Sequence, residues 1–322
     1  MTTARRTRAV AIGIFSLSAA AIGEAQSAIA SVPASESPLA TSRMPLATSQ
    51  SGYVAARGLR MYYEIHGEGP PLVLIHGTTA TIQSSFGAII PLLARTHRVI
   101  GLEMQAHGHT ADIDRPLSFE GMADDVDAAL EQLHVARAEV VGWSMGGNVA
   151  LELAIRHPAR VKGLILSGTT YALGGMQQPV IDGIRNATPA TVPAEFHAEY
   201  ARVAPDPSAW PRHIAKVREL WLSWQGIPLE AIRGIGVPAL VLAGDADAVR
   251  AEHTLALFNL FQRSQVARFK PGDAAAAMSS SELAILPGTS HATFQDRPVL
   301  VAELIEQFLS RGMSPTNAER RH

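Results

Sequence analysis

From residue 51 onward, the chain alternates short apolar runs with longer stretches in which apolar residues recur every three or four positions. Four of the runs, at 70–77, 97–104, 161–168 and 237–247, are rich in Val, Leu and Ile and show little polar alternation. Runs of this kind are typical of strands that are buried on both faces of a parallel sheet. Because helical patterns separate them, the sequence predicts an α/β fold with a mainly parallel sheet.

The helical patterns lie between these runs. Residues 118–135 carry apolar side chains at helical spacing and begin with a Ser-x-Glu capping signal. We also expect helices over 86–96 and over 145–158, the second ending at its proline. Ahead of them, two alternating segments around Gly58 predict a hairpin.

One long region interrupts the alternation. Residues 172–232 contain no clear buried strand but hold three of the four tryptophans. The strand pattern resumes directly afterwards, which favours a helical cap inserted into a core over a second, independent helical domain. The core then comprises residues 51–171 and 233–310.

The amino-terminal segment has the layout of a secretory signal peptide. Three arginines within residues 1–8 precede an uncharged apolar run over 9–23, and Ala28 and Ala30 offer small side chains for cleavage. The run is shorter than the ~20 residues that a membrane-spanning helix needs. We therefore expect residues 1–30 to be removed and the protein to be secreted or periplasmic, with an uncleaved anchor or twin-arginine export as alternatives.

Three further segments lack apolar periodicity. Residues 31–50 are rich in Ser, Pro, Ala and Thr, which is typical of a flexible linker. Residues 262–281 are polar and interrupted by Pro-Gly, so they predict a long loop or a short extra helix. We expect a frayed tail over residues 311–322.

Composition narrows the functional classes. The chain has 322 residues, of which 47% are apolar, a formal net charge of −2 and no cysteine. The charge gives no electrostatic reason to expect nucleic acid as a partner. The lack of cysteine excludes disulfides, thiolate nucleophiles and cysteine-based zinc sites. We expect a small-molecule substrate, no nucleic acid and no stable membrane insertion after signal removal, while the oligomeric state is not indicated.

The stretch VVGWSMG passes from a predicted strand into a predicted helix at Ser144. Gly142 and Gly146 complete a G-x-S-x-G pattern, in which a sharp turn exposes a serine hydroxyl above the sheet. The turn needs nearly side-chain-free residues on both sides, and the following helix directs its amides toward any anion formed there. A plain strand-to-helix turn is the alternative, but the strand–turn–helix context favours Ser144 as a nucleophile.

A serine hydroxyl is a weak nucleophile without a base, and the pattern predicts an acid and then a histidine further along. His291 follows a predicted strand and turn, while Asp245 and Asp247 end the run at 237–247. His291 would accept the serine proton, and the aspartate would orient the imidazole. We favour Asp247 for this role, with Asp245 as the residue that would instead bond loop amides.

The oxyanion that forms on attack needs two amide donors. We expect them from Met145, directly after the serine, and from Thr78, where Gly77 allows close approach. His76 stands at the strand end and is expected to brace this loop rather than to act as a base.

The remaining expectations concern ligands. His107 and His109 stand two residues apart without a matching acid cluster, so we expect no metal, and no other cofactor is indicated. Aromatic residues of the turn and of the cap are the expected lining of a substrate pocket: Trp143, Tyr171, Trp221 and Trp224.

The segments LVLIHGTT, GWSMGG, LVLAGDAD and LPGTSHATF resemble those of the α/β-hydrolase superfamily, over roughly residues 53–310. The chain is most similar to its capped serine hydrolases, which include esterases, proline iminopeptidases, meta-cleavage-product hydrolases and cofactor-free haloperoxidases. The resemblance implies a mostly parallel eight-stranded sheet flanked by helices, with the cap at 172–232. It also implies an acid three residues after a glycine, as in Gly244 and Asp247.

One loop departs from the family pattern. The segment often written D-x-R-G-x-G-x-S reads EMQAHGHT over 103–110, with Glu103 in place of the aspartate. The serine nucleophile disfavours the dehalogenase and epoxide-hydrolase branches. We therefore expect a carboxylesterase-like serine hydrolase that acts on a small ester-like substrate. The alternatives are amide, carbon–carbon bond or perhydrolysis chemistry on the same residues, or a ligand-binding protein without turnover.

Overall fold

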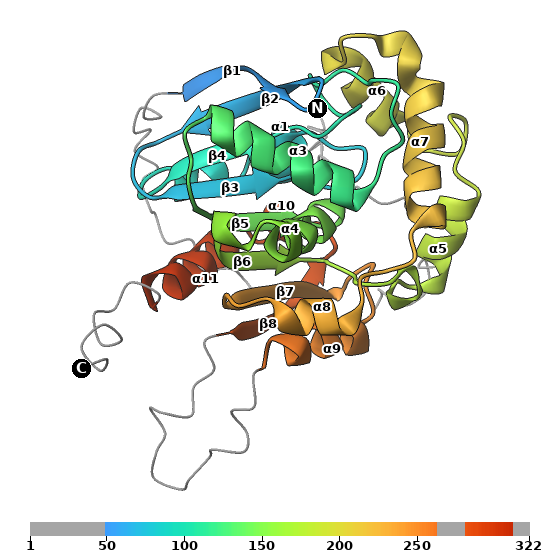
Figure 1. Cartoon of the computed structure of the whole chain (residues 1–322). Coiled ribbons are helices and arrows are strands. Elements are labelled where there is room, and N and C mark those ends of the chain that lie inside the picture. Colours follow the sequence, from blue (N-terminus) through green and yellow to red (C-terminus); the bar gives the residue numbers. More distant parts are fainter. Residues whose placement is uncertain (1–48, 263–280, 312–322) are drawn as a thin grey trace, which may run out of the picture.

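The computed structural model describes residues 49–262 and 281–311 (Figure 1). The expected signal peptide, nearly all of the expected linker, most of the irregular segment at 262–281 and nearly all of the expected tail lie outside these residues.

An eight-stranded sheet forms the centre of the molecule, with the strand order β1-β2-β4-β3-β5-β6-β7-β8. The strands are β1 (Ser49–Ala56), β2 (Leu59–His66), β3 (Pro71–Ile75), β4 (Arg98–Leu102), β5 (Ala138–Trp143), β6 (Val161–Ser167), β7 (Ala239–Ala246) and β8 (Glu282–Ser290). β2 runs antiparallel to both of its neighbours, and the other neighbouring pairs are parallel. This arrangement confirms the prediction of a mostly parallel sheet.

The first strand begins earlier than the sequence suggested. Ser49 and Gln50 pair with His66 and Ile65 of β2, although both lie within the range expected for the linker. The hairpin turn at Gly58 is as predicted, with Ala56 paired to Leu59 across it.

Helices cover both faces of the sheet (Figure 1). One face carries α3 (Phe119–Gln132), α4 (Met145–Arg156), α8 (Leu229–Gly234) and α9 (Ala251–Phe261). The other carries α1 (Ile82–Phe86), α2 (Ile90–Leu93), α10 (Thr293–Asp296) and α11 (Pro298–Arg311). Side chains alternate along a strand, so Val73 and Ile75 of β3 enter the first apolar cluster and Leu72 and Leu74 enter the second.

The single helix predicted over 86–96 is wrong. The structure has two short helices instead, α1 and α2, with Gly87 as the C-cap of the first. Pro91 lies in the first turn of α2. Backbone N–H groups there have no acceptor within the helix, so the missing N–H of proline costs no hydrogen bond. Both helices pack on the same apolar cluster, so the apolar periodicity of the sequence continues across the break. The pattern therefore does not show where the helix is interrupted.

The segment between β6 and β7, residues 172–232, is helical, and we call it the helical insert. It contains α5 (Gln178–Arg185), α6 (Ala194–Val203) and α7 (Trp210–Ser223), which lie along one side of the sheet in Figure 1. Its own small apolar cluster joins α6 to α7 through residues that include Phe196, Tyr200 and Trp210. The insert contacts the loops that follow β3 and β4, so it lies over the carboxyl ends of the parallel strands.

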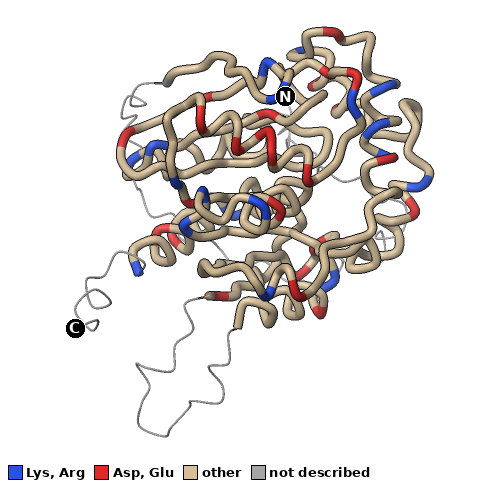
Figure 2. The backbone as a smooth tube through the Cα atoms, in the orientation of Figure 1, with Lys and Arg blue, Asp and Glu red and all other residues tan. Residues whose placement is uncertain are grey.

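Charge is distributed unevenly between elements. Figure 2 shows acidic positions along α3 and basic positions along α7 of the helical insert. None of the helices within residues 49–262 and 281–311 has the length and apolar character to cross a membrane.

Candidate active site

Ser144 lies in a sharp turn between β5 and α4. Its backbone has φ 54° and ψ −120°, a left-handed conformation that costs about 1–3 kcal/mol for a residue with a side chain. The flanking glycines permit the turn, because a Cβ on Gly142 would overlap Gly146 and a Cβ on Gly146 would overlap the carbonyl of Ile75. The structure therefore forms the strand–turn–helix geometry that the sequence predicted.

His291 and Asp247 meet in the interior. Asp247 follows β7, His291 follows β8, and Nδ1 of the imidazole lies 2.7 Å from Oδ1 of the carboxylate. Both side chains are almost fully buried, at 2% and 1% exposed. The amides of Gly244 and Val249 also donate to this carboxylate. Because a carboxylate accepts, the proton of the neutral imidazole stands on Nδ1, and Nε2 is left as an acceptor.

The structure places Asp245 elsewhere. Its carboxylate accepts the amides of Gly288 and Thr289, at 2.9 Å and 3.1 Å, near the end of β8. These amides lower the pKa of Asp245. Asp245 thus ties the end of β7 to β8, whereas Asp247 faces the imidazole.

His291 lies next to residues that adjoin the serine turn. The amide of Ser144 donates to Ser167 at the end of β6, and a Cβ on the next residue, Gly168, would lie 2.6 Å from Cε1 of His291. On the other side, the indole N–H of Trp143 donates to the carbonyl of His291 at 2.8 Å. The three predicted residues therefore share one edge of the sheet.

The serine and the histidine are not hydrogen-bonded to each other in this structure. Ser144 Oγ and His291 Nε2 are both buried, and neither has a hydrogen-bond partner among the described residues.

The loop after β3 is held by His76. Its Nδ1 donates to the carbonyl of Gly77 at 2.8 Å, and its Nε2 accepts the amide of Met104 at 3.0 Å. Complete burial lowers the pKa of His76 to about 3, so both ring nitrogens remain committed to these contacts at neutral pH. Gly77 is needed because a Cβ there would lie 2.8 Å from the ring of Trp143.

The two expected amide donors, Met145 and Thr78, have backbone N–H groups that are not used elsewhere among the described residues. Met145 is the first residue of α4, and the first amides of a helix have no acceptor within it. Thr78 follows Gly77, and none of the hydrogen bonds among the described residues uses its amide. Both groups are therefore free to donate to a bound anion.

Four aromatic residues were expected to line a pocket, and the structure gives them different surroundings. Trp143 is buried beneath Gly77 in the apolar cluster on the α1 side, and Tyr171 stacks on His253 with ring centroids 3.8 Å apart. Trp221 and Trp224 belong to the helical insert and both contact the ring of Phe119.

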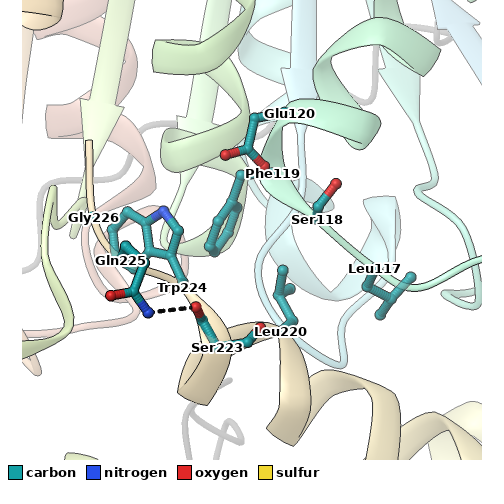
Figure 3. A pocket seen from close by; sticks show the side chains of 9 residues that line it. All are labelled: Leu117, Ser118, Phe119, Glu120, Leu220, Ser223, Trp224, Gln225 and Gly226. Carbon is teal, nitrogen blue, oxygen red and sulfur yellow. Dashed lines mark hydrogen bonds between the residues drawn. The ribbon is translucent and has the colours of Figure 1, made fainter. Parts of the chain in front are cut away.

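A pocket of about 200 Å³ lies where the insert meets the start of α3 (Figure 3). Phe119 and Trp224 form its aromatic wall, and Glu120 stands at the start of the same helix. The remaining lining residues are Leu117, Ser118, Leu220, Ser223, Gln225 and Gly226. Trp224 is thus the one predicted pocket residue that lines this cavity, and Trp221 packs directly behind it.

The loop that departs from the family pattern is built around Glu103. Its buried carboxylate accepts the amide of Ile82 at 3.2 Å and contacts Nδ1 of His109 at 3.0 Å, which raises the pKa of that histidine. His107 is buried, and burial lowers its pKa to about 4. No group of three or more side chains suited to a metal ion occurs among the described residues.

Comparison with known proteins agrees with this fold. Residues 70–208 match the family model described as alpha/beta hydrolase fold. The 2-hydroxymuconate semialdehyde hydrolase of Pseudomonas sp. is 34% identical over 134 residues, 41% of this chain and 46% of that protein. A pimeloyl-[acyl-carrier protein] methyl ester esterase of Nitrosospira multiformis is 35% identical over 112 residues, 34% of this chain and 42% of that protein. The matched segment thus spans less than half of either relative.

Solved structures extend the likeness to most of the chain. A serine hydrolase involved in carbazole degradation superimposes with a TM-score of 0.63 and 25% identity, covering 82% of this chain and 99% of that one. With the eight-stranded sheet and the family match, this shows that the chain has the α/β-hydrolase fold.

Proposed function

We propose that the protein is a serine hydrolase that cleaves a small ester-like substrate through an acyl-enzyme on Ser144. The observation that carries the proposal is the buried hydrogen bond between His291 and Asp247, which lies at the same strand edge as a serine in a strained turn. The hydrolase relatives support the same reaction class.

In the proposed reaction, Ser144 Oγ attacks the carbonyl carbon while His291 Nε2 accepts its proton. Asp247 keeps the imidazole in the required tautomer and stabilises its cation. The amides of Thr78 and Met145 stabilise the oxyanion. His291 then returns the proton to the leaving alcohol, and a water molecule deprotonated by the same imidazole hydrolyses the acyl-enzyme.

The pocket beside Phe119 and Trp224 is the candidate site for the apolar part of the substrate. Trp224 is the half-buried aromatic side chain of its wall, and Trp221, which contacts Trp224, donates a hydrogen bond to Thr78. A small aromatic or aliphatic group fits a cavity of about 200 Å³ better than a long acyl chain does.

The second candidate is hydrolysis of a carbon–carbon bond by the same residues. The relative named as a 2-hydroxymuconate semialdehyde hydrolase favours it, because the named substrate contains no ester bond. Comparing turnover of short p-nitrophenyl esters with turnover of ring-cleavage products decides between the two.

The decisive test of the nucleophile is Ser144→Ala. Hydrolysis of a short p-nitrophenyl ester is expected to fall by about 10³-fold or more, because the serine and its base act as a unit. Retained activity would overturn the assignment. A fluorophosphonate probe separates an enzyme from a binding protein without turnover: the wild-type protein should be labelled at Ser144 and the alanine variant should not.

Export is a separate proposal, based on residues 1–30. Mass spectrometry of protein recovered outside the cytoplasm should give a mature chain beginning at Ser31. An intact amino terminus on the recovered protein would contradict cleavage.

A further inference from the structure

Two adjacent threonines of the loop after β3 each contact helix α7 of the insert. The indole N–H of Trp221 donates to Oγ1 of Thr78 at 3.2 Å. Nε2 of His213 lies at hydrogen-bond distance, 3.2 Å, from Oγ1 of Thr79. Trp221 and His213 are eight residues apart, just over two helical turns, so both project from one face of α7.

The loop needs such support because its own conformation is unfavourable. Thr79 has φ 51°, in the left-handed region that a β-branched residue rarely adopts. A residue of this kind keeps its conformation only where surrounding groups hold it. The amide of Thr78, one of the two proposed oxyanion donors, is adjacent to this strained residue.

Trp221 is itself held rigidly. Its side chain is 1% exposed, and its ring lies edge-on to Phe119 at 5.1 Å and to Trp224 at 5.8 Å. Its N–H reaches Thr78, whereas the buried N–H of Trp224 has no partner among the described residues. Of these two tryptophans, Trp221 is therefore the one that connects the insert to the loop.

A second set of contacts fixes α7 over the loop after β4. Lys216 donates to Asp112 at 2.8 Å, and Arg212 donates to the other carboxylate oxygen at 3.0 Å. Lys216 also donates to the carbonyls of Ile113 and Arg115. The position of α7 is thus set independently of Thr78, as a support for that residue requires.

We propose that Trp221 is a positioning residue for the oxyanion site, so that the Thr78 amide is correctly placed only when the helical insert packs correctly on the core. The inference rests on the proposed hydrolase function. It assigns to α7 a part in transition-state stabilisation, in addition to any part in enclosing substrate.

Three variants test the link: Trp221→Phe, which keeps the aromatic packing but removes the N–H, Thr78→Val, which removes its acceptor, and the double variant. Each single change should lower kcat for a p-nitrophenyl ester about three- to tenfold, the worth of one neutral hydrogen bond, with KM changed by less than about twofold. The double variant should lose no more than either single variant. Thr78→Ser, which keeps the hydroxyl, should recover most of the kcat lost in Thr78→Val.

Glu199→Ala is the matched control. Glu199 of α6 accepts a hydrogen bond from another threonine hydroxyl of this region, Thr81, at 2.8 Å. Its removal breaks a contact between insert and core that does not involve Thr78, so kcat should be retained.

The outcomes separate this inference from the proposed function. If the wild-type protein hydrolyses esters while Trp221→Phe keeps full kcat, or if the two single effects multiply in the double variant, the positioning role is overturned and the hydrolase assignment stands. If the wild-type protein hydrolyses no ester, the proposed function fails. The link is then measured by a double-mutant cycle in urea unfolding, where additive single effects would overturn it.

Discussion

The imidazole of His291 donates to the carboxylate of Asp247 at 2.7 Å, although 44 residues separate them in the chain. Parallel strands explain the meeting. β7 and β8 are neighbours, so the residues that follow them emerge at the same edge of the sheet. The contact defines which acid serves the proposed base.

Replacing Asp247 should therefore affect activity far more than replacing Asp245. Asp247→Asn is expected to lower kcat by roughly 10³- to 10⁴-fold, because an amide no longer fixes the tautomer or stabilises the cation. Asp245→Asn removes only one of the two oxygens that accept amides of β8, and it should lower kcat less than about tenfold. Steady-state ester hydrolysis by the two purified variants checks the order, and the reverse order would contradict the assignment.

Gly168→Ala should disable the site without unfolding the protein. Gly168 has φ 55°, and its new Cβ would lie 2.6 Å from Cε1 and 2.7 Å from Nδ1 of His291, so the imidazole has to move. A shift of this size costs about 10²-fold in kcat. Gly174→Ala is the control, because nothing lies within 4 Å of the added methyl group. Equal activity of the two variants would show that His291 does not need its observed position.

Burial of His107 should make stability fall in mild acid. Its pKa is lowered from 6.5 to about 4 by burial, so the unfolded chain binds a proton that the folded chain refuses between these values. Above pH 6.5 the histidine is neutral in both states and does not change the free energy of unfolding. As the pH falls from 6.5 toward 4, the free energy of unfolding decreases, because only the unfolded chain takes up the proton. His107→Gln removes the titration, so it should gain about 2 kcal/mol relative to wild type between about pH 7.5 and pH 5. Urea unfolding of both proteins at the two pH values measures the difference, and a constant difference would contradict it.

Glu152 has the opposite dependence on pH. Burial on α4, with the charge of Glu120 nearby, raises the pKa of Glu152 from 4.5 to about 7. The folded state then disfavours the carboxylate, so stability is lost as pH rises from 4.5 through 7. Glu152→Gln should stabilise the protein by about 1–3 kcal/mol at pH 8 and lose this advantage at pH 4. Thermal unfolding at both values is the measurement, and stabilisation that is larger at pH 4 would contradict the raised pKa.

The parallel strands and the serine turn were predictable because each depends on a short run of neighbouring residues. β3 is fully apolar apart from its first residue and is buried on both faces, and the turn at Ser144 needs glycine at two fixed positions. The spacing from Gly244 to Asp247 likewise favoured the acid that the structure places beside His291.

The contacts that the sequence did not reveal join distant segments. Trp221 and Thr78 are 143 positions apart, and no local periodicity relates an indole N–H to a particular hydroxyl. The break between α1 and α2 was missed for a different reason, since both helices use one apolar face and only Gly87 and Pro91 mark the interruption. Long-range side-chain pairing and short helix breaks are therefore where pattern reasoning fails for this chain.

Trp143 touches both halves of the proposed machinery at once. Its ring lies against Gly77, and its N–H is bonded to the carbonyl of His291. The indole of Trp143 thus sets the distance between the loop after β3, which contains Gly77, and the residues after β8, which include His291. A smaller side chain at position 143 would remove both contacts, so a change there alters the positions of Gly77 and His291 together.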